Sequence, residues 1–373
     1  MNFYKKYNIK INFDEQNLIK KAEKSYNTKP IHITDFESYL SEGRKHDYFS
    51  MGDYWWPDPE QPDGLPYIHK DGKTNPDNFN KHRLLLRNLR TNVVNLTAGY
   101  LLNNNEKYVE KACQFLKEFF LDEETKMNPH LRYAQAIPGR CSGRGIGIID
   151  TLHLIGIPVA IDILKENKKF SSEVYQGLLA WFSKYLDWMT SHEYGKKEMK
   201  MSNNHGVCWC VQVAIFAKFT GNQKYINFCK KRYKEVILPE QMDKDGSFPR
   251  ELDRTKPYGY SIFILDNMIN LCYILSTPED NLWNYKLKDG RGIKKGIEFL
   301  YPYLKNKDKW PYSPDVQHFE NWPVRIASLL FATTAFDEKK YLDLWYNLPK
   351  DPDDMEIKRN VAIRQPINWL KCN

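Results

Sequence analysis

The sequence lacks the marks of a membrane protein, of a disulfide scaffold and of a zinc protein. We find no run of about 18 apolar residues, so no membrane-spanning segment and no membrane partner is predicted. The seven cysteines are an odd number. Those in apolar helical stretches are predicted to be buried free thiols: Cys113, Cys208, Cys210, Cys229 and Cys272. Cys208 and Cys210 are too close together for a zinc knuckle and face no second pair, so we expect no metal and no cofactor.

The first residues, Met1 to Lys6, also lack the apolar stretch of a signal peptide. The chain as written is therefore expected to be cytoplasmic. A periplasmic or secreted location is expected instead if a leader has been removed upstream of Met1.

Acidic residues are in the minority. Asp and Glu number 47 against 55 Lys and Arg, which leaves a net charge of +8, and aromatic residues reach 14%. A basic, aromatic-rich surface suits two classes of partner, nucleic acid and acidic polysaccharide. Because the basic residues are spread along the chain and no nucleic-acid-binding module is recognisable, nucleic acid fits poorly. We predict an acidic polysaccharide or oligosaccharide as the partner, while the oligomeric state stays open.

Strands with period-two alternation and regular sequence repeats are both missing, and helical periodicity dominates. It runs through segments separated by short Gly, Pro or Asn breaks: 81–101, 108–120, 147–166, 172–190, 205–220, 223–237, 261–276, 291–305, 321–336 and 338–347. Consecutive helical hairpins must bury their apolar faces on neighbours, as a solenoid or as a ring, and the absence of repeats disfavours the solenoid. The predicted fold is all-α, an incomplete (α/α) toroid or barrel of consecutive helical hairpins, in a single domain over residues 1–373.

Two segments interrupt the helical pattern. The segment at about 50–78 contains Tyr-Trp-Trp-Pro-Asp-Pro, and its length and aromatic content are typical of a lid-like binding loop. The segment 127–146 is polar and basic and leads into a glycine-rich stretch around Arg144. No predicted strand precedes these glycines, which disfavours a dinucleotide loop. Arg144 therefore either lies near an anionic ligand or belongs to a structural turn.

The residues Asn203-Asn204-His205-Gly206 directly precede an apolar helical segment. Asn203 is expected to cap that helix, because its side-chain oxygen can accept a hydrogen bond from a free amide. Asn204 and His205 would then project from the helix N-terminus, where their donors and the helix dipole can neutralise a carboxylate. The capping and functional interpretations are compatible.

Arg254 and Tyr260 lie six residues apart, on the approach to the helix predicted at 261–276. Both side chains can face one site. The structural alternative is a half-buried tyrosine and an arginine paired with Glu251 or Asp253.

A further cluster around Asp315 and Glu320 offers two carboxylates, the pair that an inverting glycosidase requires. Asp315 and Glu320 lie in one loop, and no acid elsewhere in the sequence stands among aromatic residues in a comparable way. A rim or packing role is therefore the favoured interpretation for this cluster.

Five motifs follow one another along the chain: Tyr-Trp-Trp-Pro-Asp-Pro at 54–59, Pro-Asp-Gly-Leu-Pro-Tyr at 62–67, Gly-Arg-Gly-Ile-Gly-Ile-Ile-Asp at 143–150, Asn-Asn-His-Gly at 203–206 and Glu-Leu-x-Arg-Thr at 251–255. Together they resemble the alginate lyase domain superfamily, most closely polysaccharide lyase family 38 and more distantly the family 5 alginate lyases. The resemblance runs from about Lys29 to the final Trp-Leu. It implies an incomplete α/α toroid with a deep cleft, and metal-independent β-elimination on uronic acid polymers.

The resemblance also implies roles for single residues. The catalytic residues would be Asn204, His205, Arg254 and Tyr260. The Arg–Tyr spacing is one residue shorter than in the family 5 pattern, so Tyr258 is kept as the alternative tyrosine. Substrate would meet a lid tyrosine at Tyr67 or, in reserve, Tyr54, together with stacking rings and basic side chains: Trp55, Trp56, Lys70, His82, Arg83, Arg132 and Arg144.

The chemistry of elimination agrees with these residue types. Removal of the C5 proton places negative charge on a group that is already a carboxylate, and Asn204, His205 and Arg254 would stabilise it by hydrogen bonds. Because an unperturbed tyrosine has a pKa of about 10, a base at Tyr260 needs nearby positive charge, which Arg254 can supply. The same tyrosine can protonate the departing O4 where both atoms lie on one face of the sugar, as in mannuronate and glucuronate. In guluronate they lie on opposite faces, and His205 would serve as base.

We therefore expect a lyase for an acidic β-1,4-linked uronan, most simply mannuronate-rich alginate. The alternative within enzymes is a lyase for glucuronan or another uronan. The alternative from another class is a non-catalytic protein that binds acidic polysaccharide.

Overall fold

The computed structural model describes residues 5–6, 11–350 and 354–371. Helices account for 57% of the chain and strands for 4%, which confirms the all-α prediction. By their internal contacts the residues form two compact units. Unit 1 comprises residues 1–70, 74–197 and 364–373, and unit 2 comprises residues 71–73 and 198–363. The prediction of a single domain over 1–373 stays a prediction.

Unit 1 is built around α2 (Lys81–Asn103), which packs against α1 (Glu15–Tyr26), α3 (Glu106–Phe120) and α4 (Gly156–Leu164). Its remaining elements are α5 (Ser172–Ser191), the start of α6 (Glu193–Met199), the 3₁₀ segments η1 (Ile33–Asp35), η2 (Gly145–Ile155) and η6 (Pro366–Asn368), and the parallel strands β1 (Lys5–Lys6) and β6 (Leu370–Lys371). The helix predicted at 147–166 is split into η2 and α4. Pro158 lacks the amide hydrogen that a continuous α-helix would donate to Leu154.

The prediction that the chain contains no run of about 18 apolar residues is wrong, because Gly145–Leu164 is such a segment. This stretch of η2 and α4 has a mean hydropathy of 1.8 and is long and apolar enough to cross a membrane. However, 78% of it is buried inside the protein. Its apolar character is therefore accounted for by packing in the core of unit 1.

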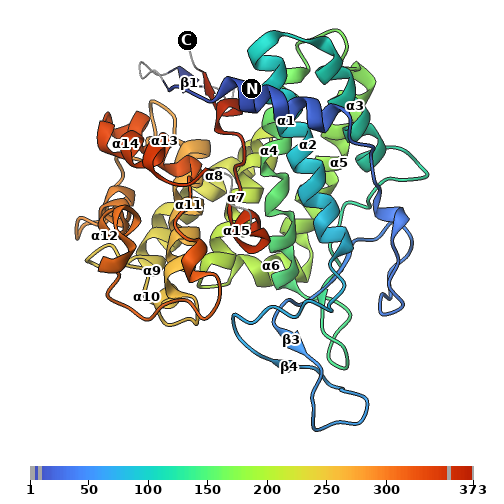
Figure 1. Ribbon diagram of the computed structural model, residues 1–373, viewed down its shortest axis with the longest axis horizontal. Coiled ribbons are helices and arrows are strands. Elements are labelled where there is room, and N and C mark those ends of the chain that lie inside the picture. The colour runs from blue at the N-terminus through green and yellow to red at the C-terminus, as the bar shows by residue number, and fades with distance from the viewer. Residues whose placement is uncertain (1–4, 7–10, 351–353, 372–373) are drawn as a thin grey trace. The chain divides into compact units, whose positions relative to one another are not determined.

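The aromatic segment at 50–78 is held by short strands. Strand β2 (Phe49–Met51) pairs in parallel with β5 (Tyr133–Ala136), and β3 (Trp55–Trp56) pairs antiparallel with β4 (Ile68–His69). In Figure 1 the β3–β4 hairpin extends away from the helices of unit 1. Its base is anchored by the buried Asp150, whose Oδ2 accepts hydrogen bonds from Ser50 Oγ at 2.6 Å and Tyr48 OH at 3.0 Å.

Unit 2 is centred on α7 (Asn204–Phe219) and α11 (Pro257–Leu275), which pack against each other. The other helices are α8 (Gln223–Arg232), the π-helical turn η3 (Tyr233–Ile237), α9 (Leu238–Gln241), α10 (Pro249–Leu252), α12 (Ile293–Lys305), η4 (Lys307–Lys309), η5 (Phe319–Asn321), α13 (Ala327–Phe336), α14 (Lys339–Asn347) and α15 (Met355–Asn360). The predicted helix at 321–336 begins only at Ala327, because Pro323 cannot donate a helical hydrogen bond.

The two central helices of unit 2 are buried almost throughout. Every residue of α11 is buried except Tyr260, and every residue of α7 is buried except His205 and Lys218. A helix that is apolar on all sides belongs in a core. Partly exposed polar side chains in the first turns of α7 and α11 therefore stand out as candidates for function.

The cysteine prediction is confirmed. Cys113, Cys208, Cys210, Cys229 and Cys272 are free and buried, and Cys141 is free and half-buried. Their surroundings are core packing within the two units.

Asp266 in α11 is a buried acid that lies outside every predicted site. It is 2% exposed, its Oδ2 accepts a bond from Asn270 Nδ2 at 3.5 Å, and Ser328 lies beside the carboxyl group. Burial raises the pKa of this carboxyl to about 6. Because the folded pKa exceeds the unfolded value, the contribution to stability is full below about pH 4 and is lost as the pH rises to about 6.

Asp266→Asn should therefore stabilise the protein at about pH 8 by up to about 3 kcal/mol, because it removes a buried charge and keeps an oxygen for Asn270. The difference from wild type should shrink as the pH falls towards about 4. Urea unfolding at several pH values measures it. Asp308→Asn is the matched control, since Asp308 is exposed. A variant that gives no stabilisation at the higher pH would contradict the buried-charge interpretation.

Candidate active site

The N-terminus of α7 is shaped by the motif Asn-Asn-His-Gly. Asn203 caps the helix as predicted, and its side chain accepts a hydrogen bond from the amide of His205 at 3.2 Å. A Cβ atom at Gly206 would lie 2.1 Å from the carbonyl oxygen of Met201. Glycine is therefore required there, because the preceding backbone passes too close for any side chain.

Asn204 is held by a buried carboxylate. Its backbone amide donates to Glu251 Oε1 and its side-chain Nδ2 donates to Glu251 Oε2, both at 2.7 Å. Asn204 is 3% exposed and Glu251 of α10 is 0% exposed. The pair thus joins the first residue of α7 to α10 through two charge-assisted hydrogen bonds.

His205 is oriented by a second buried acid. Its Nδ1 lies 2.7 Å from Glu198 Oε1, and Glu198 is 1% exposed whereas the His205 side chain keeps 14% of its surface. With the Nδ1 hydrogen donated to the carboxylate, the neutral ring carries its lone pair on Nε2. That nitrogen makes no hydrogen bond to the described residues, so it is available to a ligand.

Arg254 follows α10 directly and is clamped by Asp71. Its Nε and Nη2 donate to the two Asp71 oxygens at 3.2 and 2.7 Å, and Thr255 Oγ1 also donates to this carboxylate at 3.0 Å. The predicted structural pairing of Arg254 with Glu251 or Asp253 is therefore replaced by Asp71. On its other side the guanidinium lies over the ring of Tyr260, 4.6 Å from the ring centroid.

The structure separates the two candidate tyrosines. Tyr258 is 0% exposed, and its hydroxyl donates to the carbonyl oxygen of Tyr303 at 3.0 Å. Its predicted contact with substrate is therefore contradicted by its position in the core. Tyr260 is the partly exposed residue of α11, and it is the one in contact with Arg254.

Asp315 fixes the start of α11. Its carboxylate accepts hydrogen bonds from the amides of Tyr258 at 2.8 Å and Gly259 at 2.9 Å, and it is 7% exposed. An acid at a helix N-terminus satisfies free amides and complements the dipole. This is the packing role favoured from the sequence, and it positions the turn that carries Tyr260.

The charges of this site are coupled. Burial raises the pKa of the Glu251 carboxyl, although the hydrogen bonds from Asn204 and the charges of Arg254 and His205 act in the opposite direction. Burial tends to lower the pKa of Arg254, but the hydrogen bonds to Asp71 and the nearby Tyr260 and Glu251 outweigh it and raise it. Unit 2 therefore brings Asn204, His205, Arg254 and Tyr260 into one connected network.

The hairpin residues predicted to bind substrate lie in unit 1 and form an aromatic and basic group of their own. Trp55 has the guanidinium groups of Arg140 and Arg144 at 5.3 and 5.7 Å from its ring centroid, and Lys70 Nζ lies 5.1 Å from the ring of Trp56. Such cation–π contacts leave both rings partly exposed.

The remaining residues of unit 1 that are predicted to bind substrate are exposed or half-buried. Tyr54 and Tyr67 are half-buried, and Tyr54 lies against the ring of His69. Arg132 is exposed. Arg144 is held in place by Gln135, which accepts from its Nε and Nη2 at 3.0 Å each. The prediction that Arg144 lies near an anion stays a prediction, because the structural turn accounts for these bonds.

The predicted substrate contacts of His82 and Arg83 are contradicted. Both residues are buried, at 3% and 4% exposure. The ring nitrogens of His82 bond to the amide of Phe49 at 2.9 Å and the carbonyl of Phe36 at 2.8 Å. Arg83 is paired with acids inside unit 1, Asp53 and Asp150. Their hydrogen-bonding capacity is thus used for the fold.

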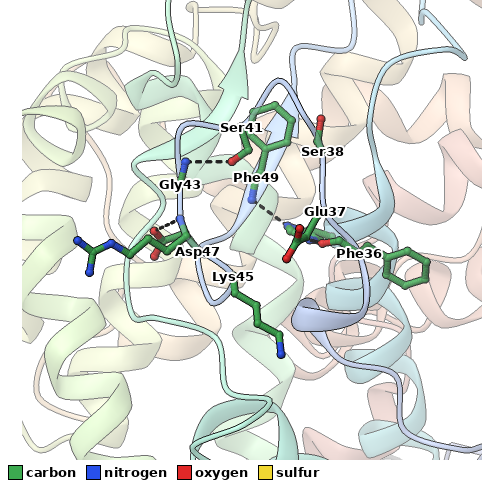
Figure 2. A pocket seen from close by; sticks show the side chains of 10 residues that line it. Phe36, Glu37, Ser38, Ser41, Gly43, Lys45, Asp47 and Phe49 are labelled. Carbon is green, nitrogen blue, oxygen red and sulfur yellow. Dashed lines mark hydrogen bonds between the residues drawn. The ribbon is translucent and has the colours of Figure 1, made fainter.

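A pocket of about 300 Å³ lies in unit 1. Its lining residues belong to other parts of the sequence than the network of unit 2. Figure 2 shows its lining side chains, which include both charge signs. It is lined by Phe36, Glu37, Ser38, Ser41, Gly43, Arg44, Lys45, Asp47, Phe49 and His82. None of the predicted catalytic residues lines this pocket, so it is not the candidate active site.

Sequence reasoning missed the acids that hold the site. Glu251 stands in the Glu-Leu-x-Arg-Thr motif, which was a usable signal, but it was considered only as an arginine partner. Glu198 and Asp71 stand in polar stretches without any pattern, and Arg140 was not singled out. The roles of Glu251, Asp71 and Arg140 depend on contacts across long sequence separations, whereas Glu198 lies seven residues before His205.

Known proteins resemble this chain in sequence and in structure. The family model of alginate lyases matches residues 32–310. The crystal structure of an alginate lyase from Bacteroides ovatus is 35% identical, with 94% of this chain and 93% of that chain covered and a TM-score of 0.81. No curated protein matches the chain.

Two structures of alginate lyase A1-III are more distant. A variant complexed with tetrasaccharide is 13% identical over 94% of this chain and 92% of that chain, with a TM-score of 0.57. The enzyme from Sphingomonas species A1 is 14% identical over 86% of this chain and 85% of that chain, with a TM-score of 0.52. At this identity they show the fold alone.

Alginate lyases have an α/α toroid fold, so these matches confirm the predicted fold class. The assignment to family 38 rather than family 5 stays a prediction. With three quarters of the sequence matched by the family model and 35% identity to a solved member, the chain belongs to the alginate lyase family of polysaccharide lyases.

Proposed function

We propose that this lyase cleaves an acidic β-1,4-linked uronan, most simply mannuronate-rich alginate, by β-elimination at the network of unit 2. The observation that carries the proposal is the contact between Arg254 and Tyr260. Tyr260 is the partly exposed residue of an otherwise buried helix, and a guanidinium lies 4.6 Å from its ring centroid. A fixed positive charge beside the ring favours the phenolate, the form that can accept a proton.

The reaction requires a base at C5 and an acid at O4. In the proposed step, Tyr260 takes the C5 proton, a double bond forms between C4 and C5, and the C4–O4 bond breaks. The proton then passes from Tyr260 to the departing O4. One residue can perform both transfers in mannuronate and glucuronate, because the C5 hydrogen and O4 lie on the same face.

Asn204 and Arg254 would stabilise the carboxylate as charge accumulates on it, and His205 would add a donor when both of its ring nitrogens carry a hydrogen. The donors are preorganised, since each is already held by a carboxylate: Glu251, Glu198 and Asp71 respectively. Donors that are fixed before the reaction need no reorganisation when the charge develops. His205 has a second possible use, because its Nε2 lone pair can accept the C5 proton of guluronate when Nδ1–H faces Glu198.

The hairpin of unit 1 and two arginines of the segment 127–146 would supply carbohydrate contacts. Trp55, Trp56 and Tyr67 offer partly exposed rings for stacking on sugar faces. Lys70, Arg132 and Arg144 offer positive charge for flanking carboxylates. Stacking rings combined with cations suit a polymer that carries a carboxylate on every sugar.

A panel of uronans tests the reaction. Incubation with polymannuronate, polyguluronate and glucuronan should produce ultraviolet absorbance from the new unsaturated uronate, with the largest rate on polymannuronate. A neutral β-1,4-glucan, which carries no carboxylate, should produce none. A larger rate on glucuronan would identify glucuronan as the preferred substrate and would leave the proposed mechanism unchanged. A flat trace on every acidic polymer, with binding retained, would replace the lyase by a binding protein.

Two tyrosine variants test the assignment of the base. Tyr260→Phe should lower kcat by at least about 10³-fold, because it removes the group that transfers the proton, while KM changes little. Tyr258→Phe removes a hydroxyl bonded inside the core, so it should cost about 1 kcal/mol of stability and leave kcat near wild type. Initial rates and thermal unfolding of both variants measure the two effects. If Tyr260→Phe kept full activity and Tyr258→Phe lost it, the roles would have to be exchanged.

A further inference from the structure

The two carboxylate oxygens of Glu251 each accept a hydrogen bond from the same residue, Asn204. This arrangement fixes the direction in which the side-chain amide of Asn204 points. The backbone amide bonds to Oε1 and the side-chain Nδ2 to Oε2, at 2.7 Å each. An ionised carboxylate only accepts hydrogen bonds. It therefore selects the rotamer in which the nitrogen of the Asn204 side chain, and not its oxygen, faces Glu251.

The orientation leaves one hydrogen for a ligand. Nδ2 carries two hydrogens, and one of them is used by Glu251. Among the described residues the second has no protein acceptor. If the amide were flipped, its oxygen would occupy the place of that donor, and a substrate carboxylate would meet a lone pair instead of a hydrogen.

We propose that Glu251 is a positioning residue, which holds the Asn204 amide in the one orientation that donates a hydrogen bond to the substrate carboxylate. This inference rests on the proposed function, because it needs the uronate carboxylate as the acceptor. It adds a residue that does not itself touch the substrate. Its effect reaches the reaction through Asn204.

The burial of Glu251 is consistent with a specific task. A carboxylate at 0% exposure is costly unless it is paired. The amide at the start of α7 satisfies part of this need, and the charges of Arg254 and His205 lie nearby. A neutral residue could cap the first amide of α7 at a lower desolvation cost. Only an acceptor without a donor excludes the flipped amide.

The first test is Glu251→Gln. A glutamine can still accept from the backbone amide of Asn204, but its own NH2 group must face the side chain, so the Asn204 amide flips. We expect kcat on the best uronan to fall by about 10²-fold, the usual cost of one lost oxyanion donor, with KM changed much less. Glu279→Gln removes the same charge from an exposed position of unit 2 and should match wild type.

The second test exchanges the carboxylate and the amide between positions 251 and 204. In the double variant Asn204→Asp with Glu251→Gln, the glutamine donates to the new carboxylate, so both hydrogen bonds between the positions are kept with one reversed. Thermal unfolding should return towards the wild-type midpoint, whereas kcat should stay low, because no amide donor is left for the substrate. A kcat that recovers together with stability would show that the reaction needs no amide donor at position 204.

The outcomes separate this inference from the proposed function. If wild type cleaves no uronan, the proposed function fails, and the side-chain ¹⁵N–¹H signals of Asn204 in wild type and Glu251→Gln still report whether Glu251 orients the amide. If wild type is active and Glu251→Gln keeps kcat within about twofold, the inference is overturned. Recovery of kcat in the double variant would also overturn the inference. This second test remains usable if Glu251→Gln alone does not fold.

Discussion

A buried carboxylate bonded to the start of a buried helix is the constraint on which the candidate site depends. Glu251 has no exposed surface, and both of its oxygens accept hydrogen bonds from Asn204. Removing such a group from water is costly unless its oxygens are satisfied. The pair therefore fixes α10 against α7. Because Arg254 follows Glu251 by only three residues, the same contact also limits where the guanidinium can lie.

The basic groups of the candidate site are already matched by acids before any substrate arrives. Arg254 and His205 are each paired with an acid, Asp71 and Glu198, and Glu251 adds a third carboxyl group. A uronate carboxylate therefore does not enter a strongly positive pocket. Its stabilisation would depend on the direction of donors that are already fixed, in the manner of an oxyanion hole. The net charge of +8 acts at longer range, where it attracts a polyanion to the protein surface.

Much of the fold could be predicted from local patterns. Apolar periodicity identified α2, α3, α5, α7, α11, α12 and α14 to within a few residues, because a helix that packs in a core must repeat its apolar face. The breaks at Pro158 and Pro323 moved helix boundaries, since proline has no amide hydrogen. The apolar stretch Gly145–Leu164 was overlooked. His82 and Arg83 were misassigned because polar residues near a motif look alike whether they face solvent or are buried.

The sequence by itself determined the family and the residue types of the site, since the Asn-Asn-His-Gly and Glu-Leu-x-Arg-Thr motifs carry both. It also determined that α7 and α11 are core helices. Only the tertiary structure distinguishes Tyr260 from Tyr258, because both lie at the start of one helix and their burial differs. It likewise decided that Asp71, Glu198 and Glu251 hold the site. Asp71 lies far from Arg254 in the chain, and such contacts leave no periodic signal in a single sequence.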